Sequence, residues 1–250
     1  MPPSSTTFAQ TFDDVADVQG WMTEAQAQRL WDRATELRAP ARIVEIGSYQ
    51  GRSAIVFGRA AAEGVEVVAI DPHAGNDRGP QQIHGAPDEG QADHEIFLAN
   101  LAEAGVASRI RHVRQPSHEA HGDVPGDIDL LYIDGAHRYG PARDDIRDWG
   151  ARVREGGTLL IHDSFSSVGV TLALLTQLFF TGRYRYVGRS GSMTEYRRTR
   201  LSLTERLANA GRQAAQLPWF ARNVVIKVLI LAHLGRFTRY LGHREPTWPF

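Results

Sequence analysis

The chain has 250 residues, of which 42% are hydrophobic, with no cysteine and a formal net charge of −1. This length is enough for a full hydrophobic core, and the lack of cysteine excludes disulfides and thiolate metal sites. The first residues lack the basic and apolar regions of a secretory signal, and we identify no apolar run of roughly 20 residues. We therefore expect a cytoplasmic protein.

The small net charge conceals an asymmetry between the body and the C-terminal tail. Residues 1–196 carry 18 basic and 27 acidic residues, whereas residues 197–250 carry ten basic and two acidic ones. A basic tail favours an anionic surface or an acidic partner. We expect a helical extension that packs on the acidic body of its own or a neighbouring subunit. The acidic body also disfavours nucleic-acid binding.

Residues 1–38 are predicted to hold a lead-in and one helix. Residues 1–20 are rich in Ser, Thr, Pro and Asp, which is typical of a loose segment. Thr23-Glu24-Ala25-Gln26 has the spacing of a capping box, and the helix should run to about Leu37. Ala39-Pro40 ends it.

A strand, a glycine-containing loop and a helix open the second predicted domain, residues 39–200. Residues 42–46 form a buried strand, GSYQGRS follows at 47–53, and a helix continues to about Ala62. Gly47 and Gly51 let the backbone approach a ligand, near the free N–H groups of the helix N-terminus. A second strand, 67–70, ends at Asp71, where nucleotide-binding folds place an acid for ribose hydroxyls. Because 47–52 reads GSYQGR, the dinucleotide fingerprint is absent, which disfavours NAD or FAD.

Residues 72–92 are predicted to be a long loop. Its length indicates a lid or acceptor-binding loop, with disorder until a ligand binds as the alternative. A helix from His94 to about Ala104 and a strand over 109–113 should follow. Gln115 and Ser117, beyond that strand, offer polar groups suited to an adenine edge.

Two further strands carry the most chemically informative residues. The strand 130–133 ends at Asp134, His137 lies in the next turn, a helix spans about 141–154 and a turn occupies 155–157. The following strand, 159–161, ends at His162-Asp163. Carboxyl ends of neighbouring parallel strands meet at one sheet edge, so these polar side chains should lie together. Asp134 and Asp163, with or without His162, suit Mg²⁺, and His137 is placed to be a general base.

The rest of the chain completes the predicted fold. A helix over 168–180 and two antiparallel strands, 184–187 and 193–197, give an α/β, Rossmann-like, seven-stranded and mostly parallel sheet with helices on both faces. A C-terminal helical extension, 201–250, should break at Pro218. Residues 219–234 could form a dimer-forming or core-covering helix, or one on a membrane surface. The lack of a clean polar face favours burial against protein.

Four segments carry a family resemblance: VEIGSYQGRS, AIDPHAG, LLYIDGAHRYGPARDDIRDW and EGGTLLIHDSF. They resemble the class I S-adenosylmethionine-dependent methyltransferases, and more narrowly the metal-dependent sugar O-methyltransferases related to macrocin O-methyltransferase. The resemblance covers about residues 40–165. It implies that S-adenosylmethionine is bound by Glu45, Gly47, Ser48, Tyr49, Gly51, Ser53, Asp71, Gln115, Ser117 and Asp134.

The same resemblance implies the metal and the base. Asp134, His162 and Asp163 would bind Mg²⁺ or a similar divalent cation, and His137 would be the general base. His162 stands where relatives commonly carry an acidic ligand. The expected function is methylation of a hydroxyl of a sugar: a glycoside, a polysaccharide such as a mannoside or rhamnoside, a glycolipid or an antibiotic sugar. We expect a homodimer.

Three other functions remain open from the sequence. A catechol-type small-molecule O-methyltransferase would use the same bound divalent cation to hold its acceptor. A related Fe-dependent hydroxylase is an alternative because His and Asp side chains can bind Fe(II). A non-enzymatic scaffold would use the basic tail to bind a membrane or a partner.

Overall fold

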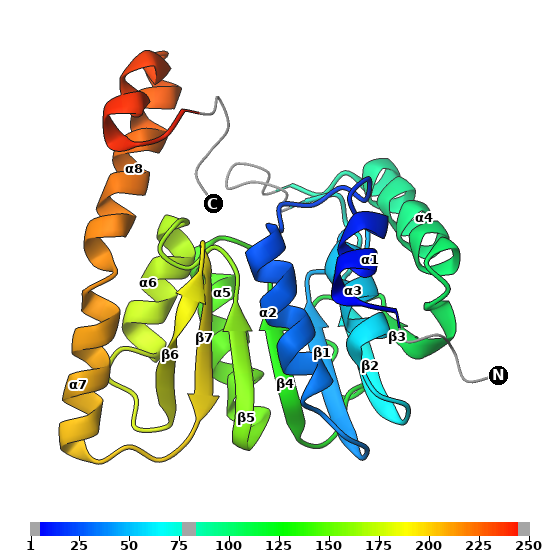
Figure 1. Cartoon of the computed structure of the whole chain (residues 1–250). Helices are drawn as coiled ribbons and strands as arrows, with labels where there is room; N and C mark the ends of the chain where they lie inside the picture. Colours follow the sequence, from blue (N-terminus) through cyan, green and yellow to red (C-terminus); the bar gives the residue numbers. More distant parts are fainter. Residues whose placement is uncertain (1–5, 77–83, 245–250) are drawn as a thin grey trace.

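The computed structural model describes residues 6–76 and 84–244, and Figure 1 shows their arrangement. Seven strands form one sheet in the order β3-β2-β1-β4-β5-β7-β6. The strands are β1 (Ala41–Ile46), β2 (Val65–Ile70), β3 (Ile110–Val113), β4 (Ile128–Ile133), β5 (Val153–Ile161), β6 (Tyr184–Ser190) and β7 (Met193–Arg198). Strands β1 to β5 pair in parallel, and β7 is antiparallel to both β5 and β6. The predicted seven-stranded, mostly parallel sheet is confirmed.

Helices cover both faces of this sheet (Figure 1). They are α1 (Phe8–Asp14), α2 (Glu24–Thr35), α3 (Arg52–Ala60), α4 (Pro87–Glu103), α5 (Tyr139–Asp148), α6 (Val168–Gln177), α7 (Leu203–Ala214) and α8 (Leu217–Leu231). Three short 3₁₀ helices are η1 (Ala107–Arg109), η2 (Gly150–Arg152) and η3 (Gly235–Leu241).

Alternate residues of the central strands point into two separate hydrophobic cores. Val44 of β1 and Leu131 of β4 face the core beneath α5 and α6. Ile43 and Leu130, their neighbours in sequence, face the core beneath α2, α3 and α4. Because successive strand residues point to opposite faces, a strand buried on both sides must be apolar throughout. This explains why the sequence shows short continuous apolar runs.

Helix α1 contradicts the expected loose lead-in over residues 1–20. The Thr7 side chain accepts a hydrogen bond from the Gln10 backbone N–H, and the Gln10 side chain accepts one from the Thr7 backbone N–H. Phe8 stacks on Phe12 and contacts Trp31 of α2 edge-on, with ring centroids 5.9 and 6.0 Å apart. A local capping box and a tertiary aromatic contact therefore stabilise a seven-residue helix in a polar stretch.

Two other predicted boundaries are wrong. Helix α4 begins at Pro87, seven residues before the predicted start, because proline and the acids Asp88 and Glu89 suit the first helical turn. Strand β5 begins at Val153, so the predicted turn 155–157 lies inside the strand as an irregularity in its pairing with β4. The predicted loop 72–92 is thus shorter. Its residues 77–83 lie outside the described part of the chain, and its lid role stays a prediction.

The tail forms two helices, α7 and α8, which meet at Ala215 and Gln216 just before Pro218, so the predicted break near this proline is confirmed. Residues Leu203–Leu231 continue through α7 and α8, with Pro218 in the first turn of α8, where its missing N–H costs little. By length and composition, residues Leu203–Leu231 could cross a membrane, which the apolar runs of the sequence did not indicate. Only 11% of an apolar 18-residue window within this segment is buried. Residues 219–231 are therefore not a core-covering helix of their own chain over much of α8, and burial against a second copy stays a prediction.

Candidate active site

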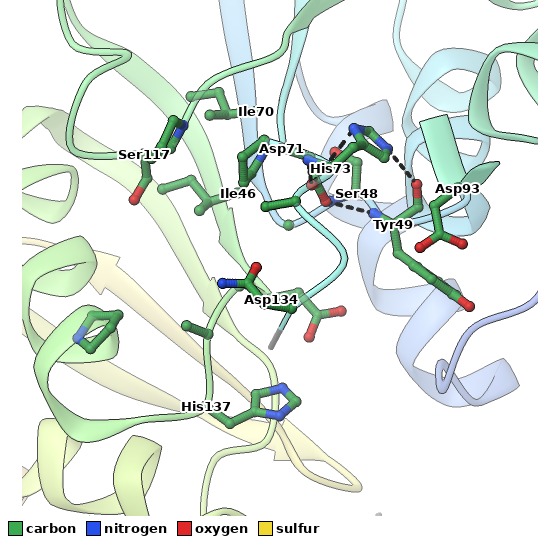
Figure 2. Close-up of a pocket in the computed structure, with 18 of the residues that line it drawn as sticks. Ile46, Ser48, Tyr49, Ile70, Asp71, His73, Asp93, Ser117, Asp134 and His137 are labelled. Carbon is green, nitrogen blue, oxygen red and sulfur yellow. Dashed lines mark hydrogen bonds and ion pairs between the residues drawn. The ribbon is translucent and has the colours of Figure 1, made fainter. Parts of the chain in front are cut away.

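A pocket of about 410 Å³ lies at the carboxyl edge of the sheet (Figure 2). It sits where the strand order reverses between β1 and β4, the position at which open α/β sheets bind ligands. Its volume falls within the roughly 300–1,000 Å³ of small-molecule sites. Of the predicted site residues, those that line it are Gly47, Ser48, Tyr49, Ser53, Asp71, Ser117, Asp134 and His137. Glu45, Gly51, Gln115, His162 and Asp163 lie outside this lining.

Gly47 is required by the close approach of a neighbouring strand end. Its φ is +86°, and a methyl group on its Cα would lie 2.3 Å from the Asp134 carbonyl oxygen. Its N–H donates to the Ile70 carbonyl, and the Asp134 N–H donates to the Ile46 carbonyl. The loop after β1 thus packs closely between the ends of β2 and β4.

Asp71 shapes the same loop by accepting backbone hydrogen bonds. Its Oδ2 accepts from the N–H groups of Ser48 and Tyr49, both at 2.9 Å, and its Oδ1 accepts from that of His73 at 2.7 Å (Figure 2). Three backbone donors hold this carboxylate in place. Asp71 lines the pocket, and its role toward a ribose stays a prediction.

Glu45 is buried beneath the pocket and not exposed in it. The Ser53 hydroxyl donates to its Oε1, and its side chain is almost wholly removed from water. Burial raises the pKa of Glu45 from its ordinary 4.5 to about 8, against the hydrogen bonds from Ser53 and Ser48 that lower it. The folded protein therefore binds the Glu45 proton more tightly than the unfolded chain does.

This pKa predicts a specific pH dependence of stability. Between pH 4.5 and 8 the unfolded chain loses the Glu45 proton first, so this group makes the free energy of unfolding fall as pH rises. We expect Glu45→Gln to flatten that fall in denaturant titrations across this window. Glu63→Gln, at an exposed position, is the control. Equal pH slopes for both variants would disprove the assignment.

His137 is held by Asp163, as the adjacent strand ends predicted. Its Nε2 lies 3.0 Å from Asp163 Oδ2. Burial lowers the pKa of His137, but the hydrogen bond and charge of Asp163 and the charge of Asp134 outweigh burial and raise it above its ordinary value. Burial raises the pKa of Asp163, but His137 and His162 outweigh it and hold that pKa well below its usual range. Nδ1 is the ring nitrogen that this pair leaves for another contact.

Asp134 and His162 form a second pair beside the first. His162 Nδ1 lies 3.1 Å from Asp134 Oδ1 and 3.8 Å from Asp163 Oδ1, and the Tyr132 hydroxyl donates to Asp134 Oδ2 at 2.9 Å. Burial lowers the pKa of His162, but the charges of Asp134 and Asp163 outweigh burial and raise it to about 9. The predicted metal ligands are thus paired with each other.

This arrangement does not fit a divalent cation. Among residues 6–76 and 84–244, no three His, Asp or Glu side chains are grouped as metal ligands. The imidazole of His162 lies within 4 Å of both predicted carboxylate ligands and pairs with Asp134. The sequence predicted that Asp134, His162 and Asp163 lie together, as they do, and their role as metal ligands stays a prediction.

Sequence reasoning missed two parts of the pocket wall. Trp21 stacks on Tyr49 with ring centroids 5.6 Å apart, the Tyr49 hydroxyl donates to Gln19 and Arg52 donates to the Gly20 carbonyl. On the other side, the Ser117 hydroxyl donates to Asp145 of α5 at 2.5 Å, and burial raises the pKa of this acid to about 6. The tryptophan before a capping box was the one sequence signal for the first of these.

Comparisons with known proteins agree with this geometry. Residues 44–164 match the family model Methyltransf_24, described as a methyltransferase domain. The uncharacterised protein y4gI of Sinorhizobium fredii is 29% identical over 130 residues, half of this chain but 13% of that protein. The chain therefore spans about an eighth of the length of this relative.

Solved structures share the fold at low sequence identity. The O-methyltransferase TomG from Streptomyces achromogenes, in complex with SAM, has a TM-score of 0.54 at 18% identity, over 78% of this chain and 89% of that one. The O-methyltransferase NovP has a TM-score of 0.59 at 15% identity, over 74% and 84%. The O-methyltransferase from Bacillus cereus, in complex with SAH, has a TM-score of 0.53 at 15% identity, over 79% and 93%.

Proposed function

We propose that this chain moves a methyl group from S-adenosylmethionine to a hydroxyl oxygen of an acceptor, and that the preferred acceptor is a sugar. Its central unit is a class I S-adenosylmethionine-dependent methyltransferase domain. The observation that carries the proposal is the pairing of His137 with Asp163 at the pocket that also contains the Gly47 loop. A base and a cofactor loop on one sheet edge are what methylation of a hydroxyl requires.

The residues of the pocket suit the cofactor. Asp71 holds the N–H groups of the loop after β1, α3 begins directly behind that loop, and the Trp21–Tyr49 stack covers one side. We propose that these elements hold the amino acid and ribose parts, and that Ser117 and Asp145 lie toward adenine. When bound, S-adenosylmethionine supplies an electrophilic methyl group on a sulfonium sulfur.

The chain's own contribution is to prepare the acceptor. Asp163 accepts a hydrogen bond from Nε2 of His137 and so fixes the ring and its tautomer, which leaves Nδ1 to take the proton from the acceptor hydroxyl. With S-adenosylmethionine bound, that oxygen would take the methyl carbon as the carbon–sulfur bond breaks and its electron pair stays on sulfur, and His137 would hold the proton until solvent removes it. Holding both reactants in line is worth about 7–11 kcal/mol of the barrier in favourable cases.

An oxygen acceptor is supported by the shared fold of the O-methyltransferases TomG, NovP and that of Bacillus cereus. The choice of a sugar comes from the DGAH and HD segments, which resemble sugar O-methyltransferases. Asn76, His118 and Arg138 line the same pocket with groups able to hydrogen-bond sugar hydroxyls. A catechol is the competing acceptor.

Magnesium dependence stays a prediction of the sequence that the side chains do not support. Because His162 Nδ1 lies 3.1 Å from Asp134 Oδ1 and 3.8 Å from Asp163 Oδ1, the proposed reaction assigns no role to a metal ion. His137 and Asp163 can carry out proton removal by themselves.

The test is incubation of the pure protein with methyl-labelled S-adenosylmethionine and either fractionated bacterial glycans or catechols, with Mg²⁺ or with EDTA. We expect label in a glycan fraction, with transfer continuing in EDTA. Label only in catechols would replace the sugar acceptor. Loss of methyl transfer in EDTA, restored by Mg²⁺, would show that the reaction needs the metal. Asp134 and Asp163 would then bind the metal in place of their present contacts with His162.

A further inference from the structure

The C-terminal residues 217–244, comprising α8 and η3, form an arm that rises beyond the carboxyl edge of the sheet (Figure 1). Helix η3 folds back beside α8, and the Arg222 guanidinium donates to the Leu241 carbonyl at 2.6 Å. This is the edge of the sheet that contains the pocket. The arm is thus a two-element projection with a defined shape.

The base of the arm is fixed to the body near the proposed catalytic pair. The Asn223 side chain donates to the Phe165 carbonyl, and the Lys227 ammonium donates to the Ser166 carbonyl at 2.9 Å. Ile226 is fully buried between these contacts. Phe165 and Ser166 lie two and three residues after Asp163, so the arm has a set orientation relative to the pocket.

The preceding helix α7 prevents residues Leu203–Leu231 from crossing a bilayer. The Asn209 side chain accepts from the Tyr186 N–H and donates to the Tyr184 carbonyl, two backbone groups on the outer edge of β6. The Gln213 side chain accepts from the Tyr196 hydroxyl. Withdrawing α7 into a membrane would leave these buried groups unpaired. An arm that lies on a surface keeps them intact.

Beyond this base, the arm exposes large apolar side chains to solvent. Six of them lie within 16 residues and are each at least 40% exposed: Val225, Val228, Leu231, Leu234, Phe237 and Tyr240. Leaving this much apolar surface in water is unfavourable, so such a patch typically marks a contact surface. Its position on a projection, rather than in a groove, suits a flat partner.

The charges of the arm identify the chemistry of that partner. Residues 217–244 contain five basic residues and no acidic one: Arg222, Lys227, Arg236, Arg239 and Arg244. The guanidinium groups of Arg236 and Arg239 each lie 4.9 Å from an exposed ring, those of Phe237 and Tyr240. Aromatic and aliphatic groups mixed with cations, without any anion, suit the headgroup layer of an anionic bilayer.

We propose that α8 and η3 dock on an anionic membrane surface, with the apolar side chains of residues 225–240 entering the headgroup layer and the arginines pairing with lipid phosphates. Docking there orients the carboxyl edge of the sheet, and with it the pocket, toward the bilayer. The proposal does not depend on the acceptor or on turnover.

The test is sedimentation of the full-length protein with vesicles, without any methylation assay. We expect it to sediment with phosphatidylcholine vesicles that contain phosphatidylglycerol, about tenfold more than with phosphatidylcholine alone, and to be released by salt. Leu231→Glu/Phe237→Glu should lose about tenfold of this binding. Leu203→Glu/Leu207→Glu is the matched control, because those leucines are at least as exposed but belong to α7.

Circular dichroism and thermal unfolding should show both double variants folded, since all four positions are exposed. Equal binding to both kinds of vesicle, or equal losses in the two variants, would overturn the proposal. The proposal would also be overturned if the wild-type protein did not bind vesicles and formed a dimer in sedimentation velocity that Leu231→Glu/Phe237→Glu converts to a monomer. That result would assign the arm to a second copy of the chain.

Discussion

Replacing His137 with alanine is expected to abolish methyl transfer while S-adenosylmethionine still binds. The variant removes the proposed general base, and a positioned general base contributes about 10²–10⁴ in rate. The cofactor loop should persist, because Asp71 and the backbone around Gly47 hold it without His137. Single-turnover transfer and calorimetric cofactor binding measure the two effects separately.

His121→Ala is the control for this experiment. The His121 ring stacks on Trp149 at 4.3 Å, away from the lining of the pocket, so its loss should leave transfer near the wild-type rate. Normal turnover by His137→Ala would remove the proposed base. Loss of cofactor binding together with turnover would make His137 a structural residue instead.

Substituting alanine for Gly47 should disrupt the cofactor pocket. The new methyl group would lie 2.3 Å from the Asp134 carbonyl oxygen, and the φ of +86° disfavours any residue with a Cβ. Overpacking costs about 1–3 kcal/mol and a left-handed backbone about 1–2 kcal/mol. Because the strain falls on the loop after β1 and on Asp134, we expect lower stability in denaturant titrations and a loss of cofactor affinity.

Gly122→Ala provides the matched comparison. Nothing lies within 4 Å of a methyl group at that glycine, which is exposed and is not among those with positive φ. It should retain wild-type stability and affinity. If Gly47→Ala also retained both, the close approach of the loop to the end of β4 would not matter for binding.

The predicted strands over 42–46, 67–70 and 130–133 are confirmed because their pattern is local. Each is a short apolar run that ends at a glycine or an acid, and burial on both faces requires such a run. The start of α4 and the course of β5 were wrong for a shared reason. Pro87 can begin a helix as well as interrupt one, and Gly156-Gly157 can sit inside an irregular strand as well as in a turn.

The exposure of the tail needed the tertiary structure for a different reason. The sequence of α8 lacks a clean polar face, which usually indicates burial, yet most of its length extends past the body. Hydrophobicity shows that a surface needs a partner, but it does not say whether that partner belongs to the same chain. The position of α7 along β6 decides this, since it carries α8 beyond the sheet.

By itself, the sequence determined the sheet, the glycine-containing loop after its first strand and the set of polar residues at the strand ends, because these depend on neighbours a few positions apart. Only the tertiary structure decided how those polar residues pair. His137 meets Asp163 and His162 meets Asp134 across two strands, so the predicted metal ligands contact each other. Trp21 reaches Tyr49 through the packing of the N-terminal segment. Such contacts join distant positions, and only the packed chain shows which partner each side chain finds.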